Sequence, residues 1–330
     1  MSWSNRLCRG LAALCLTMTG FAAEASYSNV FFFGDSLSDT GNVYKVTGGT
    51  FPPPPYYNGR FSDGPLWTER VAAGLGLAAD SKASQLGGNN YAWAGALSGV
   101  DGHAAPGTGL LAQVFGQWAP AHAGAADPKA LYVIGIGSND LLDALANNGG
   151  TAQADYDYRH SVANSLLVNL TSSLQYLIGA GAQNFLIANV TDLGLTPRMN
   201  LGGKGAVATE VSKYYDALLD STLDSLGQLF AVNIAELDLF GLLTEVVGDT
   251  KAGGQRFGLG NGVYPCFAPG APACSTSVFA DDIHPTQIVQ ARAGELALAA
   301  LRVPEPGTVA LLGIGVVLLA ATRRGGRQIV

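Results

Sequence analysis

The sequence of 330 residues has little charge and no excess of basic residues. Charged residues make up 13% of the chain, and 25 Asp and Glu outnumber 18 Lys and Arg, which gives a formal net charge of -7. A protein that binds a nucleic-acid backbone neutralises phosphates with a basic surface, so we expect no nucleic-acid partner. Low charge together with 48% hydrophobic residues is typical of a folded chain with a buried core rather than of a disordered one.

Histidine and cysteine are scarce as well, with four of each. The histidines are dispersed along the chain: His103, His122, His160 and His284. Cys8 and Cys15 lie near the N-terminus, and Cys266 and Cys274 lie together near the end of the chain. Two cysteines without clustered histidines do not make a zinc site, so we expect no zinc.

The N-terminus has the pattern of an export signal. Arg6 and Arg9 precede an apolar run over residues 11–23, and Ala23-Glu24-Ala25 has the small residues that a signal peptidase requires. Residues 1–25 are therefore predicted to be a signal peptide that is cleaved after Ala25. The alternative is a membrane anchor, but the run is shorter than the about 20 residues of a membrane-spanning helix. Export would carry Cys266 and Cys274 into an oxidising compartment, where we expect them to form a disulfide.

The C-terminus, residues 303–330, has three parts in order. Pro304-Glu305-Pro306 comes first, an apolar run over residues 309–321 follows, and Arg323, Arg324 and Arg327 come last. This segment resembles the PEP-CTERM sorting signal of Gram-negative bacteria. The resemblance implies transient membrane insertion, processing by an exosortase, and delivery to the cell envelope, the cell surface or the extracellular matrix. The alternative is a plain tail anchor with its arginines in the cytoplasm.

The body between these two segments, residues 26–302, alternates short apolar runs with longer periodic segments. Continuous apolar runs predict buried strands, and apolar residues at three- and four-residue spacing predict helices. The predicted strands are residues 29–33, 131–136, 185–190 and 229–234, and the predicted helices are residues 66–77, 156–178, 206–226 and 286–301. Strands that alternate with helices indicate an α/β domain with a parallel sheet covered on both faces.

Polar residues follow the apolar runs, where an open parallel sheet binds its ligands. Gly34-Asp35-Ser36 follows the first run, Gly137-Ser138-Asn139-Asp140 follows the second, and Asp281-Asp282-Ile283-His284 lies near the end of the body. These segments contain a hydroxyl, an imidazole and a carboxylate. Together these groups are the parts of an activated serine nucleophile.

Four blocks in this order resemble the GDSL esterase/lipase family of the SGNH hydrolase superfamily. They are Gly34-Asp35-Ser36-Leu37, the block 90–95 that ends at Gly95, Gly137-Ser138-Asn139-Asp140, and Asp281-x-x-His284. The resemblance covers the whole body and implies a flavodoxin-like three-layer α/β/α sandwich. It also implies that Ser36 is the nucleophile. The chain lacks the Gly-x-Ser-x-Gly motif of the α/β-hydrolases.

The chemistry of acyl transfer explains the remaining roles that the family implies. His284 takes the proton of Ser36, and Asp281 orients the imidazole and stabilises its charged form. The oxyanion is bound by the backbone N–H groups of Ser36 and Gly95 and by the side-chain amide of Asn139. Four alternatives stay open for these residues: Ser36 as a helix cap, His284 as a loop histidine at a helix start, Asp282 in place of Asp281, and Asn139 as a partner of loop backbone.

The sequence therefore predicts an exported serine ester hydrolase that acts on acyl esters or lipids without a cofactor. Three alternatives remain. The first is removal of O-acetyl groups from an exopolysaccharide, which the sorting signal suggests. The second is an acyltransferase, which differs only in whether water or an alcohol attacks the acyl-enzyme. The third is a surface or matrix protein that keeps the fold and has little activity.

Overall fold

The computed structural model of the chain describes residues 27–147 and 151–301; the predicted signal peptide and sorting segment lie outside these residues. A parallel sheet forms the centre of the domain. Its strands are β1 (Val30–Gly34), β2 (Leu131–Gly135), β3 (Asn184–Ala188) and β4 (Asn233–Leu237), paired in the order β1-β2-β3-β4. All five residues of β1 are buried, as expected of a strand that is covered on both faces.

A short segment around Asn90 extends the sheet beyond β1. Asn90 forms a parallel bridge with Phe32, and the backbone N–H of Tyr91 donates to the carbonyl of Phe32 over 2.7 Å. The N–H of Trp93 donates to the carbonyl of Gly34 over 3.0 Å. Because β2 occupies the other side of β1, the spatial order with this segment included is that of flavodoxin-like sheets. The predicted fold class is confirmed.

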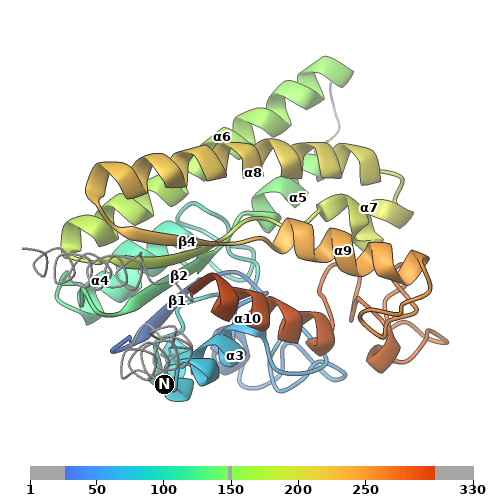
Figure 1. Cartoon of the computed structure of the whole chain (residues 1–330), viewed down its shortest axis with the longest axis horizontal. Helices are drawn as coiled ribbons and strands as arrows, with labels where there is room; N and C mark the ends of the chain where they lie inside the picture. The colour runs from blue at the N-terminus through green and yellow to red at the C-terminus, as the bar shows by residue number, and fades with distance from the viewer. Residues whose placement is uncertain (1–26, 148–150, 302–330) are drawn as a thin grey trace, which may run out of the picture. The chain divides into compact units, whose positions relative to one another are not determined.

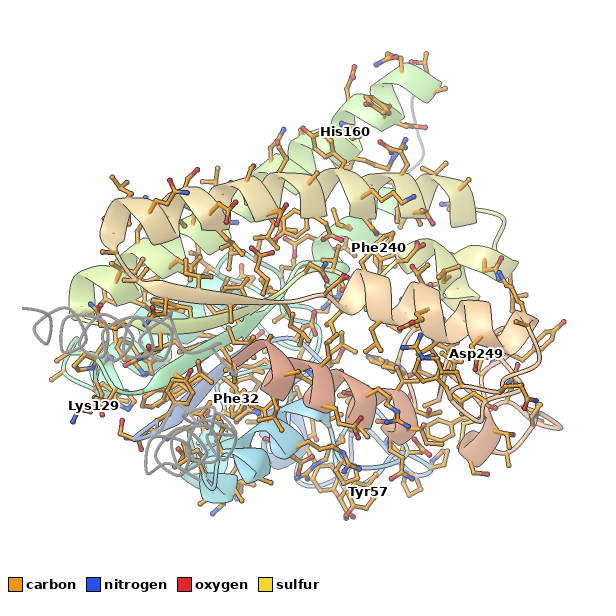
Figure 2. All side chains as sticks on the ribbon, in the orientation of Figure 1. Phe32, Tyr57, Lys129, His160, Phe240 and Asp249 are labelled. Atoms are coloured by element: carbon orange, nitrogen blue, oxygen red, sulfur yellow. A yellow bond between two sulfur atoms is a disulfide. The ribbon has the colours of Figure 1, made fainter. Side chains whose placement is uncertain are left out.

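Helices cover both faces of the sheet (Figure 1). The long helices α6 (Ala152–Ala180) and α8 (Gly205–Phe230) lie on one face, and α3 (Trp67–Gly74) and α10 (Gln287–Leu301) lie on the other. Side chains fill the space between these layers (Figure 2). The other α-helices described are α2 (Asn42–Val46), α4 (Ala119–Ala121), α5 (Ser138–Ala146), α7 (Pro197–Leu201) and α9 (Leu239–Lys251).

The α6 helix shows how the periodic pattern produces a layer. Its buried residues Leu166, Leu170, Leu174 and Leu177 recur every three or four positions, so they form one apolar stripe against the sheet and α8. The Thr151 hydroxyl caps the helix by accepting from the N–H of Ala154 over 3.2 Å. At the other end Gly181 adopts φ 115°, a conformation open to glycine, and ends the helix.

The strand predicted at residues 229–234 is wrong in its position. The α8 helix continues through Phe230, Ala231 turns the chain with φ 53°, and β4 begins at Asn233. Leu229 and Phe230 are exposed, so their apolar character reflects no strand burial. The edge strand β4 is largely half-buried or exposed, and for that reason it lacks a continuous apolar run.

A disulfide joins Cys266 to Cys274, as predicted. The loop it closes is tied to the body by backbone bonds of 2.9 Å from the N–H of Cys266 to Phe279 and from the N–H of Phe267 to Ala280. Within the described ranges, no helix has both the length and the apolar character needed to cross a bilayer.

Candidate active site

Ser36 lies in a tight turn directly after β1. The carbonyl of Asp35 accepts from the N–H groups of Ser38 and Asp39, and the Asp35 carboxylate accepts from the N–H of Leu37 over 3.0 Å. The turn that carries Ser36 is therefore held by its own hydrogen bonds. Burial raises the pKa of Asp35 to about 6.

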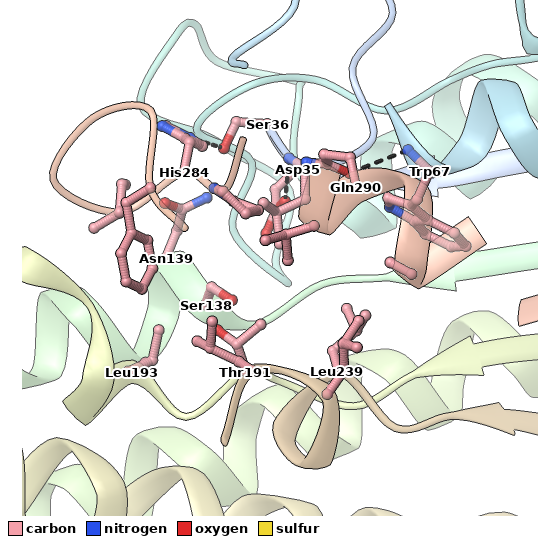
Figure 3. A pocket seen from close by; sticks show the side chains of 18 of the residues that line it. Asp35, Ser36, Trp67, Ser138, Asn139, Thr191, Leu193, Leu239, His284 and Gln290 are labelled. Carbon is pink, nitrogen blue, oxygen red and sulfur yellow. Dashed lines mark hydrogen bonds between the residues drawn. The ribbon is translucent and has the colours of Figure 1, made fainter. Parts of the chain in front are cut away.

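The turn brings Ser36 to His284, which lies 248 positions later in the sequence. His284 Nε2 is 2.7 Å from Ser36 Oγ, and His284 Nδ1 is 2.6 Å from Asp281 Oδ2. Both Ser36 and His284 are 7% exposed, so little water competes for these bonds. Figure 3 shows the serine hydroxyl facing the imidazole at one side of a pocket.

The carboxylate of Asp281 accepts four hydrogen bonds. Oδ1 accepts from the backbone N–H groups of Ile283 at 2.9 Å and His284 at 2.6 Å. Oδ2 accepts from the His284 ring and, over 2.5 Å, from the hydroxyl of Tyr56. Burial opposes the charge of Asp281, but the neighbouring imidazole and these hydrogen bonds outweigh it and hold the pKa of Asp281 well below its usual range.

Asp282 does not contact the imidazole. Its carboxylate accepts two hydrogen bonds from Arg198, at 2.8 Å from Nε and 3.0 Å from Nη2. The structure thus places Asp281, and not its neighbour, beside His284.

Asn139 and Gly95 come together on the other side of the serine turn. The Asn139 amide, in the first turn of α5, donates to the carbonyl of Ala96 over 3.0 Å. The buried carboxylate of Asp39, three residues after Ser36, accepts from the N–H of Ala94 over 2.9 Å. Gly95 is held between these two anchored residues with φ +76°, a backbone conformation that favours glycine.

A largely apolar pocket opens beside Ser36, with Asn139 and His284 at the same end (Figure 3). The space in and above the pocket that no atom fills is about 690 Å³, open solvent included. Aliphatic and aromatic side chains from α5, α9, α10, the short 3-10 helix Leu193–Leu195 and the loop before His284 form much of its wall: Leu142, Leu193, Leu239, Leu243, Phe279 and Val289. Such a wall favours a hydrocarbon ligand next to the Ser36 hydroxyl.

Tyr56 is the site residue that the sequence analysis missed. Its position in a proline-rich loop indicates only a stiff segment, and nothing local predicts a contact with Asp281, 225 positions away. Among the residues that the structure describes, no cluster of three or more His, Cys, Asp and Glu is arranged to hold a metal ion.

Comparison with known proteins decides the family. A family model described as GDSL-like lipase/acylhydrolase matches residues 30–297. The chain belongs to this family. Membership identifies it as an ester hydrolase of the GDSL type. A second model, the PEP-CTERM protein-sorting motif, matches residues 302–325 and indicates export and sorting.

Curated relatives of this GDSL hydrolase include an acyltransferase and a lipase. The phosphatidylcholine-sterol acyltransferase of Aeromonas hydrophila is 28% identical over 263 residues, which cover 78% of this chain and 70% of that protein. Lipase 1 of Photorhabdus luminescens is 31% identical over 207 residues, which cover 61% of this chain and 28% of that protein. The chain therefore spans less than a third of the lipase's own length.

Solved structures similar to this chain include an inhibitor-bound aryl esterase from M. smegmatis. The two have a TM-score of 0.41 and 14% sequence identity, with coverage of 83% of this chain and 98% of the esterase. A lipolytic protein of the G-D-S-L family from Veillonella parvula has a TM-score of 0.39 at 15% identity, with coverage of 82% of this chain and 94% of that protein.

Proposed function

We propose that the protein is an exported serine ester hydrolase that cleaves acyl esters through a covalent intermediate on Ser36. The observation that carries this proposal is the unbroken hydrogen-bond chain from Ser36 through His284 to Asp281. A serine hydroxyl is a weak nucleophile at neutral pH, and an adjacent base oriented by a carboxylate is the arrangement that activates it.

The reaction has two halves. Ser36 Oγ attacks the ester carbonyl carbon while His284 Nε2 takes the hydroxyl proton, and Asp281 stabilises the resulting imidazolium. The tetrahedral intermediate collapses, the C–O bond to the alcohol breaks, and His284 returns the proton to the leaving alkoxide. Water then attacks the acyl-enzyme with His284 as base, which releases the carboxylic acid and restores the Ser36 hydroxyl.

Three donors are proposed to bind the oxyanion: the N–H groups of Ser36 and Gly95 and the amide of Asn139. The hydrogen bond to Ala96 fixes the plane of the Asn139 amide and uses one of its two N–H groups, so the second N–H remains available to the oxyanion. Donors that are fixed before the reaction stabilise the transition state without reorganisation.

The pocket next to Ser36 supports an acyl chain longer than acetyl. Each buried methylene contributes about 0.8 kcal/mol, so a leucine-lined wall favours substrates that fill it. A second candidate is removal of O-acetyl groups from an exopolysaccharide, which the sorting motif favours. An acetyl group, however, is too short to reach most of the apolar side chains that line the pocket.

Processing at both ends is part of the proposal. Removal of residues 1–25 by signal peptidase and exosortase cleavage near Pro304-Glu305-Pro306 would free the hydrolase domain, residues 26–302, from both terminal segments. The intact mass of the protein recovered from the cell envelope and from the surrounding matrix measures both cleavages.

The test of the function compares the purified full chain with Ser36→Ala and Ser38→Ala. Ser38 lies in the same turn, and its buried hydroxyl has no partner among the described residues, which makes it a matched control. We expect Ser36→Ala to lose hydrolysis of p-nitrophenyl esters by roughly 10⁴-fold or more and to lose labelling by a fluorophosphonate, while Ser38→Ala keeps both.

The chain-length profile from acetate to palmitate separates the two substrate classes. A maximum at medium or long chains supports the acyl pocket, whereas activity restricted to acetate, with acetate release from the polymer, supports the O-acetyl esterase. A folded wild-type protein that neither labels nor hydrolyses any of these esters would refute the function.

A further inference from the structure

The hydroxyl of Tyr56 shares an acceptor with the imidazole of His284. It donates to Asp281 Oδ2 over 2.5 Å, and His284 Nδ1 lies 2.6 Å from the same oxygen. The other oxygen, Oδ1, accepts only the two backbone N–H groups of its own loop. Tyr56 is therefore the side-chain donor that competes most directly with the imidazole for the charge on Asp281.

The tyrosine ring is held in place from two sides. The Phe267 ring meets it edge-on with centroids 5.1 Å apart, and the Phe61 ring packs against it at 5.6 Å. Phe61 also contacts the His284 ring at 5.2 Å. Phe267 follows Cys266 directly, so the disulfide-closed loop supports the position of the Tyr56 hydroxyl.

Hydrogen bonds tie the segment that follows Tyr56 to the segment that follows His284. Ser62 Oγ donates to the carbonyl of Pro285 over 2.9 Å, and the Asp63 carboxylate accepts from the N–H of Gln287 over 2.7 Å. The hydroxyl and the imidazole therefore belong to one connected assembly of loops. Their shared geometry does not depend on the tyrosine side chain alone.

We propose that Tyr56 is a positioning residue that sets how strongly Asp281 attracts the proton on His284. This inference rests on the proposed hydrolase function. The hydroxyl withdraws charge from Oδ2 and fixes the plane of the carboxylate, so His284 is held in one orientation and Asp281 attracts its proton less strongly than it would without Tyr56.

Tyr56 remains a donor throughout the working pH range. Burial and the adjacent carboxylate of Asp281 raise the pKa of its hydroxyl well above the usual range. Tyr56 does not line the pocket beside Ser36, so its effect is expected in the chemical step and not in substrate binding.

Tyr56→Phe removes the hydroxyl and keeps the ring that packs against Phe61 and Phe267. Without the donor, Oδ2 holds more negative charge and attracts the proton on His284 more strongly, so the acid limb of the kcat/KM profile should move upward by about half a pH unit. Asp35 also interacts with the charge on His284 and has a pKa raised to about 6 by burial, but Tyr56→Phe leaves Asp35 in place, so the shift is the difference between the two proteins. We also expect kcat to fall roughly tenfold with KM unchanged, because the hydroxyl no longer helps to fix the plane of the Asp281 carboxylate that orients the imidazole.

The matched control is Tyr57→Phe. Tyr57 is 41% exposed at the edge of the domain (Figure 2), and its hydroxyl has no hydrogen bond within the described part of the chain. This variant should reproduce the wild-type profile. An unchanged acid limb and unchanged kcat in Tyr56→Phe would overturn the proposal.

A second readout does not depend on ester hydrolysis. The NMR resonance of the His284 Nδ1 proton, which lies in the hydrogen bond to Asp281, is recorded in wild type and in Tyr56→Phe, and it should shift when the competing donor is removed. If the wild type hydrolyses no ester, the hydrolase function fails while this resonance still decides the coupling. An identical Nδ1 proton resonance in the two proteins would refute the role of Tyr56 even if the wild type is fully active.

Discussion

The α6 and α8 layer and the loops around Ser36 are built by different means. The layer consists of two long helices whose leucines recur at helical spacing and pack against the sheet. The site consists of turns after strands and of loops, held by single hydrogen bonds such as those from Tyr56 and Asn139. Apolar burial is non-directional and is spread over many residues, whereas each hydrogen bond in the site has one geometry.

This difference separates stability from activity. A change in the helix layer should alter the free energy of unfolding and leave the chemistry of each folded molecule intact. A change in the loops around Ser36 should lower the activity of each folded molecule and leave the free energy of unfolding nearly unchanged. The three substitutions below test whether that separation holds.

The largest effect is expected from Leu174→Ala in α6. Leu174 is 0% exposed, so truncation leaves a cavity and should lower the free energy of unfolding by about 3 to 5 kcal/mol. Urea denaturation measures the loss, and active-site titration with a fluorophosphonate should show wild-type kcat for each folded molecule. Val168→Ala on the same helix, at a position 63% exposed, should change stability by less than about 0.5 kcal/mol.

The next effect concerns the barrier and not the fold. Asn139→Ala should raise the barrier of the chemical step by about 2.7 to 4 kcal/mol, which lowers kcat by about 10² to 10³. Steady-state kinetics on the preferred ester measures it. Asn169→Ala removes a comparable amide that donates to Ser98 Oγ over 3.0 Å, away from the pocket, and should keep wild-type kcat. Equal kinetics in the two variants would contradict the oxyanion role.

The smallest effect concerns the ionisation of Asp216, a carboxyl group in the α6 and α8 layer. Burial, and then the charges of Asp238, Asp192 and Glu236, raise the pKa of Asp216 in α8 to about 8. In the unfolded chain this carboxyl releases its proton at about pH 4. Between about pH 4 and the folded-state value of about 8 the folded protein therefore binds more protons than the unfolded chain, so the free energy of unfolding falls as pH rises through this range. Asp216→Asn keeps an acceptor for the N–H of Val190 and removes the titration.

Asp216→Asn should therefore raise the free energy of unfolding at pH 8 by about 1 to 2 kcal/mol and change it little at pH 4. Denaturation at both pH values is the measurement. Equal gains at the two pH values would show that ionisation of Asp216 is not the cause.

The inner strands and the helices α3, α6, α8 and α10 could be predicted from the sequence, because their apolar residues form continuous runs or recur at helical spacing. The continuous apolar run of β1 and the leucine spacing of α6 are both local signals. The edge strand β4 has no such signal, since one side of it faces solvent, and α9 was not predicted. The prediction of β4 failed because a half-buried edge strand has no continuous apolar run.

The site could be predicted only in part. The motifs around Ser36, Gly95, Asn139 and His284 indicate the reacting groups because each motif is short and contiguous. They leave open whether Asp281 or Asp282 serves the imidazole, and the structure places Asp281 there while Arg198 binds Asp282. No motif contains Tyr56, whose partner is 225 positions away.

By itself the sequence determined the α/β class, the family and the candidate site residues of the four motifs, because these depend on local periodicity and on contiguous motifs. Only the tertiary structure revealed that the Tyr56 hydroxyl lies beside Asp281 and that a leucine-lined pocket lies beside Ser36. Both arise where loops and helices distant in the chain meet at the carboxyl ends of the strands. Such meetings depend on how the layers pack, and no local pattern in the sequence records them.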